Sequence, residues 1–398
     1  MLIGRSRGIG YKDTVPDLKS IYFRALDACE PDRLVARVLE PEMPRNVVAI
    51  GKCAGALLDG LPEFENAFVA IPQDYPLPRR RAEIHQGGHP QITSASFAAG
   101  RALLDFVDGR ENLLFLISGG GSACVEVPLS PWFDEREVTE TNRRLLGSGA
   151  SIGEMNCVRK HLSALKGGRL GARVHGRSTS LVYSDVSRGA LADVASGPTL
   201  ADPTTKREAI AILQRLGGFD SILSKLSDAS CPETVKQLER SRVKLIADND
   251  TLTSAAASLA PAAVRCEYQI ECDVAEAAKI LLDRLRELKQ GQVLVAGGEP
   301  TVVTHGDGKG GRCSELAVRV ALAATEPMQA LFGSSDGVDG SSGVAGFHVT
   351  LPVTFDRAAA EQELARSNSL VAAASIGEAL TMAPTGNNLR DLYLLARS

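Results

Sequence analysis

Consecutive glycines directly after a short apolar run are the feature that most constrains the fold of this sequence. Residues 113–117 form the run, and Ser118, Gly119, Gly120, Gly121 and Ser122 follow it. Such a run predicts a buried strand that ends at the edge of a sheet, where α/β proteins bind their ligands. Without Cβ atoms, glycines can turn sharply there and point their N–H groups at an anion. The stretch predicts a phosphate-binding loop, with a tight surface turn as the alternative.

The same order of strand, loop and helix recurs along the chain. Apolar runs at 46–50, 68–71, 181–184 and 243–247 predict further strands. Helical spacing of apolar residues predicts helices over 93–107, 154–169, 252–264 and 274–289. Strands that alternate with helices favour a Rossmann-like, doubly wound α/β fold with a mostly parallel sheet.

The character of the sequence changes near Gly291. Two apolar stretches lie on either side of Gly297, Gly298, Glu299 and Pro300, and their closeness predicts a β-hairpin. A glycine loop and a helical pattern follow. We therefore expect a Rossmann-like large domain over residues 1–290 and a smaller C-terminal α/β (α+β) domain over residues 291–398. Residues 1–45 can pack elsewhere than on the large domain.

Composition excludes several classes of function. The 398 residues carry a formal net charge of −4, which does not favour binding to nucleic acid or to an anionic membrane. We expect neither a signal peptide nor a membrane span, because no apolar run is long enough. The eight cysteines lack C-x-x-C and zinc-like spacings, so we expect reduced thiols in a cytoplasmic protein. A homodimer is compatible with the sequence, which does not fix the oligomeric state.

Two groups of polar residues lie next to predicted strands. Asn156, Lys160 and Lys166 share one face of the helix predicted over 154–169, opposite its apolar face. A basic face of this kind is either solvated or turned toward a bound anion. Asp185 directly follows a predicted strand, which places it at the ligand-binding edge of the sheet. It is either a magnesium ligand or a residue that caps a helix or stabilises a turn.

Together these features indicate phosphoryl transfer. That reaction needs backbone donors and cations around the phosphates, a carboxylate for the metal and a group that orients the attacking hydroxyl. The chain offers such groups beside its glycine loops: Lys52, the 118–122 loop, Lys160, Lys166, Asp185, Glu299, Arg312 and Asp336. Residues 306–311 also fit G-x-G-x-x-G, but a hairpin before them is not the βαβ context of a dinucleotide site. A phosphotransferase is the leading hypothesis from the residues alone.

A set of motifs that spans nearly the whole chain, from Gly51 to Asn388, resembles a known family. The motifs are GKCAGALLDG, GGHP, LISGGGSA, LLGSGASIGEMNCVRKHLSALKGGRL, SDV, SGPTLADPTT, GGEPTVV, GKGGRCSEL, SSDGVDGSSGVAG and PTGNN. They resemble the glycerate 2-kinase family, whose C-terminal part is called the MOFRL domain. The agreement of so many separate motifs in the same order makes the resemblance specific.

The resemblance implies an ATP-dependent and magnesium-dependent kinase that phosphorylates the 2-hydroxyl of D-glycerate, with its site in a cleft between two domains. The family's catalytic lysine and arginine correspond to Lys52 and Arg312. We expect Arg159 and Glu299 to bind the substrate and Asp185 to hold Mg²⁺. Asp336 orients the substrate hydroxyl or, alternatively, stabilises its own turn. The residues expected to bind ATP are Ser118, Gly119, Gly120, Gly121, Ser122, Asn156, Lys160, Lys166, Ser196, Gly197 and Thr199.

This sequence departs from the family pattern at several positions that we expect beside the cleft in the small domain. They are Cys313, Ser314, Ser335, Asn387 and Arg390. The departures put the identity of the acceptor in doubt more than the type of reaction. Three alternatives therefore stay open: a kinase of another small hydroxy acid, an NAD(P)H-dependent hydroxypyruvate reductase, and a ligand-binding protein without catalytic activity.

Overall fold

The computed structural model describes residues 16–397, which form two compact units. The large unit contains residues 26–252 and 383–390, and the small unit contains residues 16–25, 253–382 and 391–397 of the described chain. This division differs from the boundary expected at residue 290. Residues 253–290 belong to the small unit, and a short C-terminal segment belongs to the large one. Of the first 45 residues, 1–15 lie outside the described part of the chain.

The large unit is built around a six-stranded sheet in which all neighbouring strands are parallel. Its strands are β1 (Asn46–Ile50), β2 (Asn66–Pro72), β3 (Glu83–Gly87), β4 (Leu113–Ser118), β5 (Ser178–Tyr183) and β6 (Ser241–Ala247). Their order is β3-β2-β1-β4-β5-β6. This is the strand order of the Rossmann fold, so the predicted fold class is confirmed.

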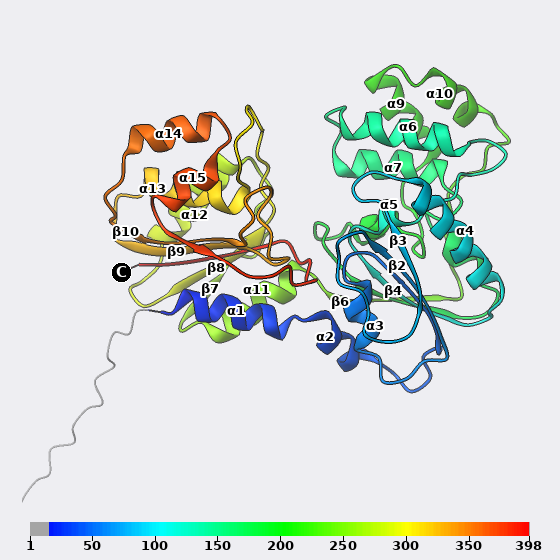
Figure 1. Cartoon of the computed structure of the whole chain (residues 1–398), viewed down its shortest axis with the longest axis horizontal. Coiled ribbons are helices and arrows are strands. Elements are labelled where there is room, and N and C mark those ends of the chain that lie inside the picture. The colour runs from blue at the N-terminus through cyan, green and yellow to red at the C-terminus, as the bar shows by residue number, and fades with distance from the viewer. Residues whose placement is uncertain (1–15, 398) are drawn as a thin grey trace, which may run out of the picture. The chain divides into compact units, whose positions relative to one another are not determined.

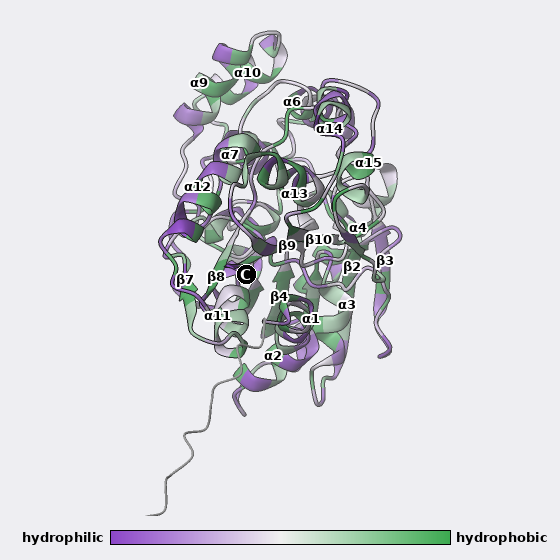
Figure 2. Ribbon diagram, turned by 90° about the vertical axis from the view of Figure 1, so that its left-hand side faces the viewer, coloured by the Kyte–Doolittle hydropathy of each residue, from purple (hydrophilic) through white to green (hydrophobic). Residues whose placement is uncertain are grey.

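Helices cover both faces of this sheet (Figure 1). The helices of the large unit are α2 (Pro31–Val38), α3 (Ala54–Asp59), α4 (Ser94–Asp108), α5 (Gly121–Cys124), α6 (Glu135–Leu146), α7 (Ile152–Leu162), α8 (Arg169–Arg173), α9 (Lys206–Leu216) and α10 (Asp220–Ser227), with a 3₁₀ turn, η1 (Leu191–Ser196). Leu103 and Phe106 of α4 pack with Phe115 of β4 in one core. β4 is buried along its whole length, and Figure 2 shows it as hydrophobic.

The helix expected over 154–169 ends earlier than predicted, at Leu162. Ser163 has an extended backbone and forms a β-bridge with Pro128. Gly167 and Gly168 then adopt positive φ angles of 59° and 81° before α8 begins. The helical spacing of residues 163–166 was therefore overridden by pairing with a distant segment. None of the helices in residues 16–397 is both long enough and apolar enough to cross a membrane.

The small unit contains a second six-stranded sheet, which is mixed. Its strands are β7 (Ala263–Arg265), β8 (Val293–Gly298), β9 (Met328–Ser334), β10 (Gly346–Leu351), β11 (Glu378–Leu380) and β12 (Asp391–Arg397), in the order β11-β10-β9-β12-β8-β7. The hairpin predicted around Gly298 is wrong. β8 pairs in parallel with β7 and antiparallel with β12. The stretch expected to be the second strand of the hairpin contributes a single β-bridge, from Thr301 to Asp273.

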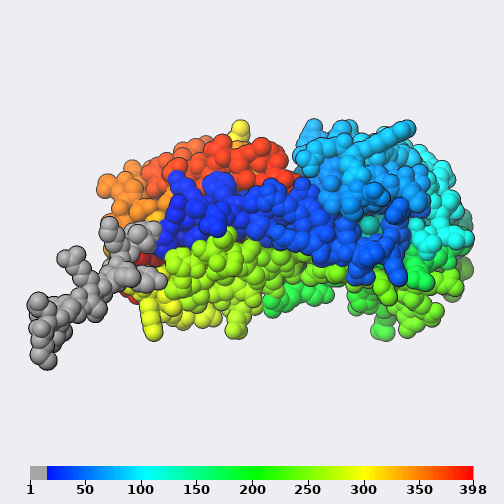
Figure 3. All heavy atoms as spheres, turned by 90° about the horizontal axis from the view of Figure 1, so that it is seen from below, coloured from blue at the N-terminus to red at the C-terminus, as the bar shows by residue number. Residues whose placement is uncertain are grey.

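Helices also flank both faces of the small sheet. They are α12 (Val274–Arg286), α13 (Arg312–Ala323), α14 (Arg357–Ala365) and α15 (Ser369–Ala374) on one face (Figure 1). The opposite face is covered by α1 (Leu18–Ala28) and α11 (Asn249–Leu259), which lie side by side in Figure 3. The phenol of Tyr22 in α1 donates a hydrogen bond to the carbonyl of Ser334 at 2.6 Å. Its ring lies against Gly333, where a Cβ atom would be 2.5 Å from it.

We predict that Gly87→Ala destabilises the large unit, whereas Gly153→Ala does not. A Cβ atom at Gly87 would lie 2.1 Å from the carbonyl oxygen of Cys124, which is backbone and cannot move easily. Such overpacking should lower the free energy of unfolding by about 1–3 kcal/mol. At Gly153, a helical residue, a Cβ atom would have no neighbour within 4 Å, so alanine there should be neutral or stabilising by up to about 1 kcal/mol. Equal urea midpoints for the two variants would contradict this account.

Candidate active site

The functional residues of the large unit gather where the strand order of its sheet reverses. β1 and β4 are neighbours, and the chain leaves β1 toward one side of the sheet and β4 toward the other. Ligands of open α/β sheets bind in the crevice at the carboxyl ends of such strands. Lys52 follows β1, the 118–122 loop ends β4, and Asp185 follows β5. The structure thus brings these three predicted features to one edge.

Asp185 lies directly against the glycine loop. A Cβ atom at Gly119 would be 1.7 Å from the Oδ2 atom of Asp185, so only glycine allows this approach. The same Oδ2 atom accepts a hydrogen bond from the side-chain amide of Asn388 at 2.7 Å. Burial raises the pKa of Asp185, while the positive charges of Lys52 and Arg390 and the amide of Asn388 oppose that rise. The carboxylate is therefore partly desolvated among cations and donors.

The backbone of Lys52 is fixed by a hydrogen bond and by the conformation of the glycine before it. Its N–H donates to the carbonyl of Gly119 at 2.9 Å, and Gly51 before it has a φ of 114°, which favours glycine. The ammonium lies 5.7 Å from the ring centre of Tyr75. Burial, followed by the charge of Lys52, lowers the pKa of His89 to about 4, so that imidazole is neutral at pH 7. The sequence showed His89 only as part of the GGHP motif and did not indicate its place near Lys52.

Ser118 stabilises the loop from inside. Its hydroxyl is fully buried, accepts a hydrogen bond from the N–H of Cys53 at 3.0 Å and donates to the carbonyl of Ile50 at 3.4 Å. It therefore joins the ends of β1 and β4. The carbonyl of Gly120 accepts a hydrogen bond from the Cys124 thiol. These contacts give Ser118 a structural role, and contact of this residue with ATP stays a prediction that its burial does not favour.

A chain of hydrogen bonds links the loop to α7. The hydroxyls of Ser122 and Ser196 are 2.8 Å apart, and Ser196 donates to the Oδ1 atom of Asn156 at 3.0 Å. Because Ser196 has a single proton, Ser122 must be the donor in the first bond. Ala195, Ser196 and Gly197 all have positive φ, between 51° and 59°, a conformation that is strained for the two residues with side chains. The structure thus unites three predicted ATP-binding residues, Ser122, Ser196 and Asn156.

The basic side chains predicted to share one helix face are buried, not solvated, and both lysines have partners inside the protein, although Lys166 lies beyond the end of α7. Lys160 is completely buried and its ammonium contacts Asp193 at 2.7 Å and Asp202 at 3.1 Å. Lys166 is 2% exposed and pairs with Glu126. Burial lowers the pKa of Lys166, and the negative charge of Glu126 opposes this. Each ammonium is thus paired with carboxylates inside the protein, and contact of Lys160 and Lys166 with ATP phosphates stays a prediction that these ion pairs do not favour.

Two further predicted residues of this region also have internal partners. Thr199 is fully buried and its hydroxyl accepts a hydrogen bond from Ser180 of β5 at 2.8 Å. Arg159 is 8% exposed, and its Nε donates to Asn142 at 2.6 Å. Burial lowers the pKa of Arg159, against the charge of Glu126. These contacts do not test substrate binding by Arg159, which stays a prediction.

Residues 383–390 complete the site, although the sequence pointed to the small domain for them. The segment belongs to the large unit. Asn387 accepts from the Tyr183 hydroxyl at 2.7 Å, and Asn388 binds Asp185. Arg390 donates from Nε to the carbonyl of Asp185 at 2.9 Å. The PTGNN motif was visible in the sequence, but only the tertiary structure shows that its last residue, Asn388, contacts Asp185.

In the small unit, Arg312 begins α13 and faces two carboxylates. Its Nε and Nη2 atoms donate to Asp391 at 3.0 and 3.2 Å, and its Nη1 atom lies 2.9 Å from Glu299. The charge of Asp391 is the main cause that raises the pKa of Arg312. Glu299, predicted to bind substrate, is thus a partner of the predicted catalytic arginine. Asp391 was not identified from the sequence.

Two aspartates of the following loop have different surroundings. Asp336 accepts from the Ser334 hydroxyl at 2.8 Å and from the N–H of Val338 at 3.0 Å, contacts that suit the turn-stabilising alternative. Asp339 accepts from the N–H groups of Cys313 and Ser314 at 2.9 and 2.8 Å and so caps α13. Burial raises the pKa of Asp339 to about 6. Sequence reasoning missed this cap because the two segments are far apart in the chain.

The glycines at 306–311 have a structural explanation that involves no dinucleotide. Cβ atoms at Gly306 and Gly308 would lie 2.6 Å from atoms of Arg366 and Asn368, and one at Gly310 would lie 1.9 Å from the Ser369 hydroxyl. The N–H of Lys309 donates to Asn368 at 3.1 Å. The loop is therefore packed closely against the connection between α14 and α15. β8 and β9, which α13 connects, both pair antiparallel with β12, which lies between them. They are therefore not the adjacent parallel strands of a dinucleotide-binding unit.

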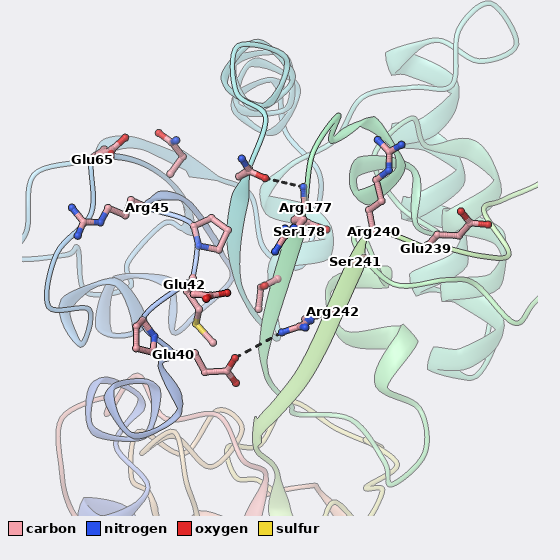
Figure 4. Close-up of a pocket in the computed structure, with 16 residues that line it drawn as sticks. Glu40, Glu42, Arg45, Glu65, Arg177, Ser178, Glu239, Arg240, Ser241 and Arg242 are labelled. Atoms are coloured by element: carbon pink, nitrogen blue, oxygen red, sulfur yellow. Dashed lines mark hydrogen bonds and ion pairs between the residues drawn. The ribbon is translucent and has the colours of Figure 1, made fainter.

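A hollow of about 1000 Å³ lies at the opposite, amino edge of the large sheet. It is lined by charged residues of both signs that precede or begin the strands, among them Glu40, Arg45, Arg177 and Arg242 (Figure 4). Glu40 and Arg242 face each other across it at 3.9 Å. Because catalytic residues of such sheets lie at the carboxyl edge, we do not assign this hollow to the reaction.

The side chains near Asp185 limit the kind of metal that could bind there. Among residues 16–397, no group of three or more His, Cys, Asp or Glu side chains could hold a metal ion. Mg²⁺ in phosphoryl-transfer sites commonly takes one or two protein carboxylates, with phosphate oxygens and water as its other ligands. Asp185 fits a metal that arrives with a nucleotide, and it does not fit a resident metal centre.

The fold and the carboxyl-edge cluster define a Rossmann-like α/β protein with a second unit built on a mixed sheet. The profile of the MOFRL family matches residues 292–391, and that of a domain of unknown function, DUF4147, matches residues 17–229. The D-glycerate 2-kinase of Thermotoga maritima is 32% identical, with 93% of this chain and 95% of that protein covered. A protein of Agrobacterium vitis with the provisional name hydroxypyruvate reductase is 31% identical, with 94% and 92% covered.

Solved structures agree with these relatives. The crystal structure of glycerate kinase from Thermotoga maritima has a TM-score of 0.82 and 30% identity, and covers 96% of this chain and 99% of that chain. The PH0495 protein of Pyrococcus horikoshii has a TM-score of 0.77 and 27% identity, with 97% and 99% covered. The chain belongs to the glycerate 2-kinase family, whose C-terminal part is the MOFRL domain.

We predict that Lys166→Met lowers the free energy of unfolding by about 3–5 kcal/mol, because it leaves Glu126 charged and buried without its partner. Adding Glu126→Gln to this variant should restore part of the lost stability, because the unpaired buried charge of Glu126 is then removed. Urea denaturation gives these values, with the exposed Lys289→Met as a control that should change stability by less than about 0.5 kcal/mol. If Lys166→Met unfolded at the same urea concentration as the parent, Lys166 would not have this structural role.

Proposed function

We propose that this protein is an ATP-dependent kinase that phosphorylates the 2-hydroxyl of D-glycerate to give 2-phosphoglycerate. The observation that carries the proposal is the cluster of Lys52, Asp185 and the glycine loop at the switch point of a Rossmann-ordered sheet. Relatives named as glycerate 2-kinases, similar over more than nine-tenths of the chain, support the same conclusion. The soluble reactants expected are ATP, Mg²⁺ and a small hydroxy acid.

The large unit would supply most of the nucleotide-binding groups. Lys52 would meet the phosphates with its ammonium, which the hydrogen bond from its N–H to Gly119 keeps at the sheet edge. The Ser122 hydroxyl and the strained backbone at Ser196 lie on the same side of the unit, next to the loop. Gly119 and Gly120 allow both Asp185 and the Lys52 side chain to approach the loop closely. Phosphate binding here would rest on few side chains and a fixed backbone.

Asp185 would hold Mg²⁺ when the nucleotide is bound. The metal would neutralise charge on the phosphates. Burial raises the pKa of Asp185, so the ionised carboxylate is less stable than in water and would gain from a nearby cation. Asn388 would keep one oxygen of Asp185 oriented through its 2.7 Å hydrogen bond.

The small unit would contribute Arg312 as the second cation for the transferring phosphoryl group. Its pKa is raised by Asp391, so the guanidinium remains charged at any relevant pH. Cations that stabilise charge developing on phosphoryl oxygens act electrostatically and need not transfer protons. Arg159 and Asp336 remain candidates for contact with the acid, on the sequence argument alone.

The hydroxypyruvate reductase alternative has one observation in its favour, the provisional name of the Agrobacterium relatives. In a Rossmann-ordered sheet, a dinucleotide fingerprint belongs in the turn after β1. That turn here reads Gly51-Lys52-Cys53-Ala54-Gly55-Ala56, which is not G-x-G-x-x-G. The fingerprint-like 306–311 loop is packed against residues 366–369. The kinase is therefore the better supported function.

We expect ADP release that depends on D-glycerate when the protein is mixed with ATP and Mg²⁺, and no NADH oxidation with hydroxypyruvate. Lys52→Ala and Arg312→Ala should each raise the barrier by about 3–5 kcal/mol, because each removes a cation from the transferring phosphoryl group. Lys289→Ala, an exposed lysine, is the control and should keep the parent rate.

Three results would revise this proposal differently. NADH oxidation without acid-dependent ADP release would favour the reductase. ADP release with another small hydroxy acid but not with D-glycerate would keep the kinase and change the acceptor. Rates of Lys52→Ala and Arg312→Ala within a few-fold of the parent would remove both residues from the mechanism.

We further predict that Asp185→Asn raises the Mg²⁺ concentration needed for half-maximal rate by at least about tenfold, because the amide keeps the shape but loses the charge that attracts the ion. The rate is measured at fixed ATP over a range of Mg²⁺ concentrations, with EDTA-treated protein as the zero point. A variant with unchanged Mg²⁺ dependence and unchanged rate would show that Asp185 stabilises its loop and binds no metal.

A further inference from the structure

Arg312 contacts two carboxylates that differ in how firmly they are held. Asp391 is fully buried and is the first residue of β12, between Gly298 of β8 and Ser334 of β9. Its Oδ2 atom also accepts a hydrogen bond from the buried hydroxyl of Tyr393 at 3.0 Å. Glu299 follows β8, and its side chain is 38% exposed. One partner is fixed in the middle of a sheet, and the other lies in a half-exposed loop.

The bond between Arg312 and Asp391 uses the side edge of the guanidinium. Nε and Nη2 each donate to one oxygen of Asp391, at 3.0 and 3.2 Å. A two-point contact of this kind sets the plane of the guanidinium as well as its position. Asp339 holds the backbone at the start of α13 through the N–H groups of Cys313 and Ser314. The backbone and the side chain of Arg312 are thus positioned by different buried carboxylates.

The Nη1 edge of the guanidinium is the one that Glu299 meets, at 2.9 Å. A phosphoryl group that binds Arg312 needs an edge with free N–H donors. Asp391 cannot leave its edge without burying an unpaired charge, which is costly. Glu299 can turn toward water at little cost because it is half-exposed.

We propose that Asp391 is the positioning residue that fixes the orientation of Arg312, and that Glu299 is an exchangeable partner on the edge that an anionic phosphoryl group takes. The proposal rests on the proposed kinase function and adds to it two residues with opposite effects. Loss of Asp391 should impair the chemical step, because Arg312 is then misaligned. Loss of the Glu299 charge should make the anion bind more easily, because it removes a competitor.

The experiment measures kcat and the KM for ATP in the parent and in four variants. Asp391→Asn should lower kcat by about 10–100-fold, the effect of a misplaced catalytic group, with a smaller change in KM. Tyr393→Phe removes one hydrogen bond to Asp391 and should lower kcat by about two- to tenfold. Glu299→Gln should leave the KM for ATP equal or lower, because the anion then no longer competes with a carboxylate for the Nη1 edge of Arg312. Arg312→Lys keeps the charge but removes the two-point contact.

A double-mutant cycle separates positioning from a general loss of structure. If Asp391 acts through Arg312, adding Asp391→Asn to Arg312→Lys should change kcat much less than it changes the parent. A purely structural effect would be the same in both backgrounds and would appear as a lower melting temperature. Tyr393→Phe, the milder change, keeps the test available if Asp391→Asn does not fold.

The outcomes separate a failure of this proposal from a failure of the proposed kinase function. An active parent with independent effects of Asp391→Asn and Arg312→Lys would overturn the positioning role. An active parent in which Glu299→Gln loses most of its kcat would show that Glu299 takes part in the reaction and is no exchangeable partner. A parent without acid-dependent ADP release would instead contradict the kinase function itself.

Discussion

The approach of Asp185 to the loop after β4 is the contact on which the arrangement of the large unit depends. It requires that residue 119 has no side chain, because a Cβ atom there would be 1.7 Å from the carboxylate. This closeness desolvates Asp185 and raises its pKa. A desolvated carboxylate needs nearby donors and positive charge, and Lys52, Asn388 and Arg390 supply them. The glycines thus act here by making room for a charged side chain, in addition to any contact of their N–H groups with phosphate.

The division of the chain places these partners of Asp185 in the same unit as Asp185. Asn388 and Arg390 come from a segment that lies about 200 residues after Asp185 and belongs to the large unit. The chain enters this unit after Met382 and leaves it before Asp391. Directly at that exit, Asp391 begins the strand that positions Arg312. One short stretch of sequence therefore supports the proposed metal ligand in one unit and the proposed catalytic arginine in the other.

Local patterns predicted five of the six strands of the large sheet, because buried parallel strands are continuous apolar runs that end in glycine or polar loops. They missed β3, whose residues are mostly exposed and form no apolar run. The same patterns failed where distant segments decide the structure. Helical spacing continued past Leu162, but Ser163 pairs with Pro128 instead. Two apolar stretches near Gly298 resembled a hairpin, although β8 pairs with β7 and β12. Strand pairing over long separations leaves no periodic signal in a single sequence.

The sequence also could not show which charged side chains are paired inside the protein. A lysine on the polar face of a helix has the same spacing whether that face meets water or a buried carboxylate, so the sequence could not show that Lys160 and Lys166 are neutralised internally. The two cations proposed to meet the transferring phosphoryl group, Lys52 and Arg312, differ from them in one respect: each is only partly buried. The side chain of Arg312 is 29% exposed and that of Lys52 is also partly exposed, so part of each side chain is accessible. Partial burial thus separates the two proposed catalytic cations from the lysines that pair with buried carboxylates, a difference that helical spacing does not encode.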